Sequence, residues 1–167
     1  MEHESTPSIA TTEIEIRPLE LGGDGAAFRT LNEEWISRYF TLEAKDREVL
    51  GDPENNILRK GGHIFQAHAA DTIVGCVALI PSADGILELS KMAVTPGMQG
   101  KGIGRKLIAH AIAQARALDA KSLILGSNSI LKDAVHLYES IGFRHVPPES
   151  LPPVHYARTN VFMKLPL

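Results

Sequence analysis

The sequence has one cysteine, Cys76, and lacks the patterns that mark several other classes of protein. A single cysteine excludes an internal disulfide and a zinc site built on cysteine pairs. No apolar run is long enough to span a bilayer, and the first residues are polar, unlike a signal peptide. Lysine and arginine form no basic block of the kind that binds nucleic acid. We therefore expect a cytoplasmic protein without a membrane or nucleic-acid partner.

The seven histidines also lack a metal-binding pattern. His63 and His68 are five residues apart, and no histidine pair has the one-turn helical spacing with an acidic neighbour that zinc enzymes use. We expect no metal site.

The composition is that of one ordinary globular domain. The chain has 167 residues, of which 44% are hydrophobic and 22% are charged, and its formal net charge is -3. This length is sufficient to bury one core, and no internal repeat or linker divides the chain. Residues 1–12 mix serine, threonine, proline and charge, so we expect a flexible tail there and one domain over residues 13–167.

Hydrophobic periodicity predicts strands and helices in the order of an α/β (α+β) fold. Strands are expected at 13–18, 62–70, 72–80, 86–94, 122–125, 143–146 and 160–165. Helices are expected at 24–40, 43–50, 102–118 and 131–141, with a loop and one helical turn at 52–62 and a turn at 81–85. A strand–helix–strand unit that follows three antiparallel strands requires one parallel pair. The sheet should therefore be mixed, with about six to seven strands.

A glycine-rich loop separates the strand at 86–94 from the helix at 102–118. It reads Gln99-Gly100-Lys101-Gly102-Ile103-Gly104, and Arg105 follows. Alternating glycines allow a tight curl that exposes backbone N–H groups at a helix start, where an anion is favoured. A dinucleotide fingerprint would need glycine at Arg105, and a P-loop would need lysine at Ile103. A structural turn and a loop that holds the diphosphate of coenzyme A remain as alternatives.

Several segments, in order along the chain, resemble the GCN5-related N-acetyltransferase (GNAT) family. The glycine-rich loop is similar to the family's pyrophosphate loop. Other similar segments are Glu88-Leu-Ser-Lys-Met-Ala-Val94, Leu137-Tyr138-Glu139-Ser140-Ile141-Gly142-Phe143 and Asn160-Val-Phe-Met-Lys-Leu165. The resemblance implies a single-domain GNAT fold with helices on both faces of the sheet. It also implies direct transfer of acetyl from acetyl-CoA to a primary amine of a small molecule, an amino acid derivative or a peptide. A homodimer is common in the family.

The resemblance also implies which residues bind the donor. Backbone N–H groups of Met92 and Val94, with Ala93 between them, would face the thioester oxygen. Further contacts with coenzyme A are implied for Gln99, Gly100, Lys101, Gly102, Ile103, Gly104, Arg105 and Asn128. Many family members have asparagine seven residues before the tyrosine, but this chain has Leu131 there. Asn128, three residues earlier, is the candidate to take over that role.

Tyr138 is the residue that the resemblance assigns as general acid, donating a proton to the leaving thiolate. Its position also suits a core tyrosine, because it shares a helix face with apolar neighbours. Cys76 lies within a predicted strand and is expected to be a buried thiol, so no acyl-enzyme is expected.

Glu88 is the candidate general base, since the attacking amine must lose a proton. Strict alternation places Glu88 with Ser90 and Met92 on one face of the strand. The opposite face would then carry Leu87, Leu89 and Ala93. A salt bridge at the sheet edge is the alternative role for Glu88, and a chain of water molecules is the alternative base.

The resemblance implies that the acceptor pocket lies outside the donor motifs, beneath the first helix, and it could also include residues near the last strand. Candidate residues are Glu33, Glu34, Trp35, Tyr39, Phe40, Tyr156 and Arg158. Carboxylates and aromatic rings suit a cationic amine, and Arg158 suits a substrate carboxylate. A solvated glutamate pair beside core aromatic residues is the alternative. Alternative functions are transfer from another acyl-CoA or to an oxygen acceptor, and a non-catalytic sensor that binds coenzyme A.

Overall fold

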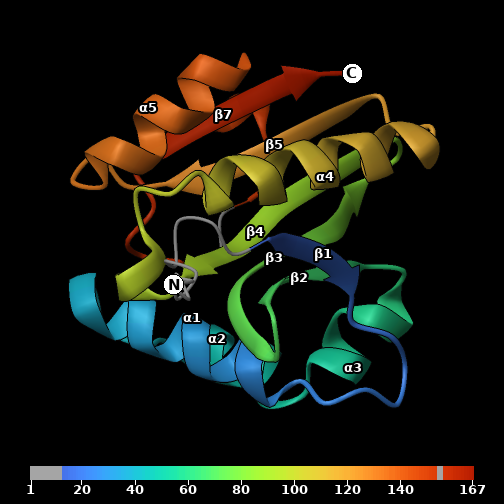
Figure 1. Ribbon diagram of the computed structural model, residues 1–167. Helices are drawn as coiled ribbons and strands as arrows, with labels where there is room; N and C mark the ends of the chain where they lie inside the picture. The colour runs from blue at the N-terminus through green and yellow to red at the C-terminus, as the bar shows by residue number, and fades with distance from the viewer. Residues whose placement is uncertain (1–12, 154–155) are drawn as a thin grey trace, which may run out of the picture.

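The computed structural model describes residues 13–153 and 156–167 as one mixed sheet with helices on both faces (Figure 1). The strands are β1 (Ile14–Pro18), β2 (His63–Ala69), β3 (Thr72–Ala83), β4 (Ile86–Val94), β5 (Ser122–Ser127), β6 (Arg144–His145) and β7 (Val161–Pro166). The α-helices are α1 (Ala26–Tyr39), α2 (Ala44–Gly51), α3 (Pro53–Asn56), α4 (Ile103–Ala117) and α5 (Lys132–Ile141). Short 3-10 helices are η2 (Leu58–Lys60), η3 (Pro96–Met98) and η4 (Pro148–Ser150). The predicted tail, 1–12, lies outside the described residues.

The strand order is β1-β2-β3-β4-β5-β7-β6, and the pair β4–β5 is parallel. Helix α4 forms the crossover between these two strands, which confirms the predicted mixed sheet. Their pairing covers only Ile86 to Glu88 on β4 and Ser122 to Ile124 on β5. Beyond Glu88, β4 runs to Val94 with no strand partner on its β5 side among the described residues. The two strands therefore diverge and leave space between them.

Each face of the sheet packs against its own helices, as the apolar spacing in the sequence predicts. On one face, α4 buries Leu107, Ile108 and Ala111. On the other face, α1 buries Phe28 and Ile36. Helices α4 and α1 consequently lie on opposite sides of the sheet in Figure 1. None of the helices in the described ranges is long and apolar enough to cross a membrane.

A β-bulge at Lys91 interrupts the alternation along β4. Lys91 and Met92 together lie opposite a single residue of β3, Val77, and Lys91 has a φ of 54°, in the left-handed region. Met92 packs against the core that contains Leu89, whereas Ala93 packs into the other core. The prediction that Met92 and Leu89 lie on opposite faces is therefore wrong, because the extra residue inverts the alternation after it.

Three predicted boundaries are also corrected. β3 continues through Pro81 to Ala83, so the expected turn at 81–85 is shorter. Proline is accepted there because β2 pairs with β3 only as far as Leu79, which leaves no ladder hydrogen bond to lose on that side. The segment 52–62 forms two short helices, α3 and η2, and β6 has only two residues.

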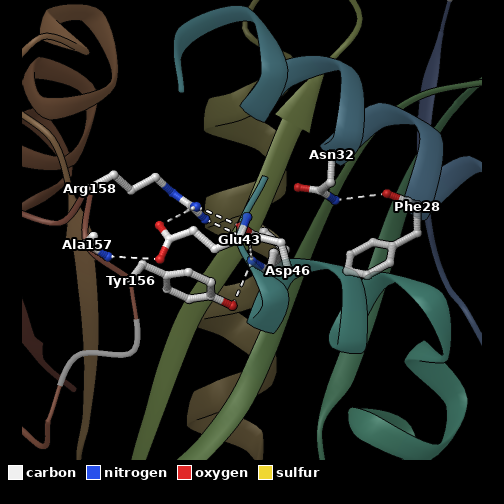
Figure 2. A network of polar contacts seen from close by, with 8 residues as sticks. Phe28, Asn32, Glu43, Asp46, Tyr156, Ala157 and Arg158 are labelled. Carbon is white, nitrogen blue, oxygen red and sulfur yellow. Dashed lines mark hydrogen bonds and ion pairs between the residues drawn. The ribbon is translucent and has the colours of Figure 1, made fainter. Parts of the chain in front are cut away.

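The carboxylate of Asp46, on α2, is fully buried and connects three parts of the chain. Its oxygens accept a hydrogen bond from Nζ of Lys91 on β4 at 2.7 Å and two from Arg158, before β7, at 2.8 Å each. The backbone N–H of Glu43 adds a fourth bond at 2.9 Å. Figure 2 shows the side chain of Arg158 extending toward Glu43 and Asp46.

These contacts decide the charge state of Asp46. Burial alone would raise its pKa, but the hydrogen bonds from Arg158 and Lys91 hold the pKa of this carboxyl well below its usual range. Asp46 is therefore ionised throughout the ordinary pH range. Because folding lowers the pKa of Asp46, its ionised carboxylate stabilises the folded protein at a pH above the pKa that it has in the unfolded chain. This stabilisation is lost as the pH falls toward the pKa of the folded state.

Replacing Asp46 with asparagine should lower the free energy of unfolding by about 3–5 kcal/mol at pH 7, because Lys91 would stay buried without its carboxylate partner and Arg158 would keep only the longer contact with Glu43. Urea denaturation measures this difference. The matched control is Glu33→Gln, which removes an exposed ion pair with Arg29 and should cost less than about 1 kcal/mol. The difference between wild type and Asp46→Asn should shrink below pH of about 4. A cost equal to that of the control would contradict the assigned role.

Candidate active site

A cavity of about 1230 Å³ opens where β4 and β5 diverge. It brings together most of the residues predicted to bind the donor: Met92, Ala93, Val94, Gln99, Gly100, Gly102, Ile103, Gly104, Arg105 and Asn128. Both candidates for proton transfer, Glu88 and Tyr138, also line it. Of the other predicted site residues, Glu33, Glu34 and Lys101 do not line this cavity.

The glycine-rich loop leaves the N-terminus of α4 open toward the cavity. Gly100 and Gly102 have φ of 78° and 82°, a region that residues with a Cβ rarely adopt. A Cβ added at either position would meet nothing within 4 Å, so the space in front of the loop is open. The N-cap, Gly102, offers no side-chain hydrogen bond, and the first turn of α4 contains no acidic residue. The free N–H groups and the helix dipole therefore suit an anion.

Side chains around the loop have partners within the protein. Arg105 donates to the hydroxyl of Ser140 at 2.8 Å and is exposed, and Gln99 donates to the carbonyl of Val94 at 3.2 Å. The amide of Asn128 donates to the carbonyl of Arg158 at 2.6 Å and accepts from the N–H of Ile130 at 2.9 Å. The side-chain amide of Asn128, a predicted contact of coenzyme A, therefore makes hydrogen bonds that shape the turn before α5.

Tyr138 lies near the C-terminal end of α5, where its ring packs edge-on against Phe143 with centroids 5.9 Å apart. Only 9% of the residue is exposed, and burial raises the pKa of Tyr138 to about 12. Its hydroxyl has no hydrogen-bond partner within residues 13–153 and 156–167. The side chain is thus a protonated phenol at the wall of the cavity, both part of the core and open to a ligand.

Glu88 is the last residue of β4 that pairs with β5, so it lies where the two strands begin to diverge. Its carboxylate is half-buried and lines the cavity. Burial lowers the pKa of the neighbouring Lys91, whereas the carboxylates of Asp46 and, more weakly, Glu88 oppose that shift. Glu88 is therefore a carboxylate close to Lys91 and to the point where β4 and β5 separate.

The first helix supplies aromatic side chains to the cavity and turns its carboxylates away. Trp35, Tyr39 and Phe40 line the cavity, with centroids 5.5 Å apart for the first two rings. Glu33 and Glu34 form ion pairs on the surface with arginines one turn away on the same helix. The predicted aromatic contribution is present, whereas these carboxylates have the solvated role named as the alternative.

Tyr156 and Arg158 reach the cavity from the segment before β7. Two cations lie close to the Tyr156 ring, with Nζ of Lys91 4.2 Å and Cζ of Arg158 4.3 Å from its centroid. Sequence reasoning missed Lys91 and Asp46, which hold this cluster together. A lysine within the apolar strand at 86–94 is the signal that could have found them, since a buried cation requires a partner.

Cys76 is confirmed as a structural thiol. It is fully buried, and burial raises its pKa to about 12. The amide of Asn32 donates to its sulfur at 3.3 Å. Within the described ranges, no three histidine, cysteine, aspartate or glutamate side chains are arranged to hold a metal ion.

Comparisons with known proteins agree with this fold. Residues 60–145 match the family model described as acetyltransferase (GNAT) domain. The uncharacterized N-acetyltransferase YjgM of Escherichia coli K12 is 30% identical over 147 residues, which are 83% of this chain and 87% of that protein.

Solved structures show the same fold. A GNAT-family acetyltransferase from Staphylococcus aureus Mu50 superposes with a TM-score of 0.82 at 23% identity, covering 91% of this chain and 98% of that one. The PaiA N-acetyltransferase of Thermoplasma acidophilum, in complex with coenzyme A, gives a TM-score of 0.72 at 19% identity, with coverage of 93% and 99%. Together with the family model and the bacterial relative, they show that this chain belongs to the GNAT family of N-acetyltransferases.

Proposed function

We propose that this protein transfers the acetyl group of acetyl-CoA directly to a primary amine of a small molecule, an amino acid derivative or a peptide. One observation carries the proposal: the uncapped N-terminus of α4 opens onto the same cavity as Glu88 and Tyr138. An anion site and two groups for proton transfer are what acetyl transfer from coenzyme A requires. The coenzyme A complex of the similarly folded Thermoplasma acidophilum protein supports this donor.

The donor fits the loop because the backbone around Gly100 and Gly102 is open and unobstructed. The N–H groups at the start of α4 would hold the pyrophosphate, and Arg105 could leave Ser140 to bind it as a fork. When bound, acetyl-CoA supplies the activated acetyl thioester. The unpaired edge of β4 after Glu88 offers backbone N–H groups, among which Met92 and Val94 are the proposed donors to the thioester oxygen.

Glu88 acts as the general base in this proposal. A lysine-like amine has a pKa of about 10.4 and is mostly protonated at pH 7, so it must lose a proton before it attacks. The Glu88 carboxylate accepts that proton directly or through ordered water. Its place at the start of the divergence of β4 and β5 brings it near the space where donor and acceptor would meet.

Tyr138 acts as the general acid. Formation of the amide bond breaks the bond between the acetyl carbon and sulfur, and the sulfur leaves with the electron pair. Burial keeps the phenol of Tyr138 protonated, and it donates that proton to the leaving sulfur. The products are then an N-acetylated amine and coenzyme A with a free thiol.

The direct test is an assay of thiol release from acetyl-CoA across a panel of primary amines, amino acids and short peptides. The expected result is thiol release that depends on one class of amine, with the acetylated product identified by mass spectrometry. Stabilisation by acetyl-CoA without acetylation of any amine would instead support the non-catalytic sensor. Preferential turnover of a longer acyl-CoA, or of an alcohol, would contradict the proposed donor or acceptor.

The loop is tested by Gly102→Val, with Gly22→Val as the matched control. Both glycines have φ of 82° and open space around the position of a Cβ, so both substitutions cause similar backbone strain. Acetyl-CoA at one hundred times its dissociation constant should stabilise the wild type by about 2.7 kcal/mol in a thermal or urea experiment. Only Gly102→Val should lose this stabilisation. Loss in neither variant would show that the donor binds elsewhere.

The acid is tested by Tyr138→Phe. This change should lower kcat by about 10²- to 10⁴-fold, because it removes the proton donor, and should leave stabilisation by acetyl-CoA unchanged. The folded state should be equally stable, since the ring contact with Phe143 remains and no hydrogen bond within the described residues is lost. Unchanged kcat would contradict the role of general acid and show that Tyr138 is a core tyrosine.

A further inference from the structure

The cluster of Lys91, Tyr156 and Arg158 forms part of the cavity wall, and the carboxylates that neutralise its two cations lie behind it. All three residues line the cavity, whereas Asp46 and Glu43, which neutralise the two cations, are not among the described residues that line it. Figure 2 shows Tyr156 and Arg158 converging on Asp46 from the segment before β7. The donors of Lys91 and Arg158 are largely used within the cluster, so the hydroxyl of Tyr156 is the donor that a ligand at this wall can meet.

Arg158 itself is largely occupied. Two of its nitrogens contact both carboxylate oxygens of Asp46 at 2.8 Å, and one of them also approaches Glu43 at 3.3 Å. A substrate carboxylate would have to displace a buried bidentate pair to replace these contacts. The sequence predicted that Arg158 contacts a substrate carboxylate. Tyr156, which lies beside it, is better placed for that contact.

The hydroxyl of Tyr156 has a proton to donate. Its oxygen accepts a hydrogen bond from Nζ of Lys91 at 2.9 Å, so the lysine faces the oxygen lone pairs and the phenolic proton points elsewhere. No acceptor for that proton is found within residues 13–153 and 156–167. Burial raises the pKa of Tyr156, and the carboxylate of Asp46 raises it further, so the phenol stays protonated. The result is a half-buried O–H donor at the cavity wall, polarised by an adjacent ammonium group.

We propose that Tyr156 recognises a carboxylate that the acceptor carries beside its amine, which makes the acceptor a free α-amino acid. This inference rests on the proposed acetyl transfer and names the acceptor within it. The amine lies toward Glu88, and the carboxylate accepts the hydrogen bond from Tyr156 in the field of Lys91 and Arg158. A zwitterionic acceptor adds one charge of each sign to a cluster in which two cations already balance two carboxylates.

The arrangement favours a carboxylate over a neutral carbonyl. The ammonium of Lys91 and the guanidinium of Arg158 both lie within 4.3 Å of the Tyr156 ring centre. A negative oxygen bound at the Tyr156 hydroxyl is attracted by both cations, and a hydrogen bond with an ionised partner is about twice as strong as a neutral one. An acceptor without the carboxylate would leave the phenolic proton unpaired at a half-buried position.

The test compares the common L-amino acids with the amines that lack only their α-carboxylate, such as leucine with 3-methylbutylamine and phenylalanine with 2-phenylethylamine. The expected kcat/KM is about 10- to 100-fold higher for at least one amino acid than for its paired amine. The corresponding amino acid amide should react as poorly as the amine. Amines acetylated as well as amino acids, or amides acetylated as well as acids, would overturn the inference and leave acetyl transfer intact. No acetylation of any compound would instead refute the proposed function, and this inference with it.

A second experiment uses the variant Tyr156→Phe. It should lower kcat/KM for the preferred amino acid by about 10- to 100-fold and leave that of the paired amine unchanged. Stabilisation by acetyl-CoA reports that the variant is folded. Thr159→Val is the matched control, because it removes a hydroxyl from another cavity-lining residue of the same segment, and it should leave the ratio of the two substrates unchanged. An equal loss of kcat/KM for the amino acid and the amine in Tyr156→Phe would contradict recognition of the carboxylate and show that Tyr156 only shapes the cavity wall.

Discussion

The buried carboxylate of Asp46 is the constraint on which the site depends. It joins α2 to the bulge of β4 through Lys91 and to the segment before β7 through Arg158. Lys91 has a left-handed backbone conformation, which costs free energy in a residue with a side chain and persists only when its surroundings enforce it. The ion pair with Asp46 supplies that enforcement. One side chain thereby connects the bulge to the segment before β7 and holds two cations close to the Tyr156 ring.

The divergence of β4 from β5 creates the cavity, and the elements around it contribute different groups to its walls. The uncapped N-terminus of α4 and the glycine-rich loop leave backbone N–H groups open toward the cavity. Glu88 lies where the strands separate, and Tyr138 projects from α5. The aromatic face of α1 and the segment at 156–158 form the walls away from the loop. In the proposed function, binding of the donor and choice of the acceptor are consequently carried by different parts of the chain.

The elements and the donor motifs could be predicted from the sequence, because local patterns carry that information. The apolar stripe of α4, the strand at 86–94 and the alternating glycines are all readable within a few residues of one another. Contacts between residues far apart in the sequence could not be read in this way. Asp46 and Lys91 are separated by 45 positions, and neither has a sequence pattern that names the other. The bulge that inverts the faces of β4 was missed for the same reason, since it is stabilised by that distant pair and not by glycine.

The central claim is that acetyl-CoA binds with its pyrophosphate at the start of α4 and its acetyl group between β4 and β5. A crystal structure of the protein with acetyl-CoA tests this claim most directly. The account predicts hydrogen bonds from the backbone N–H groups around Gly100 to Gly104 to the pyrophosphate, and a thioester close to Met92 and Tyr138. A pyrophosphate bound away from this loop, or an acetyl group outside the space between the two strands, would contradict it.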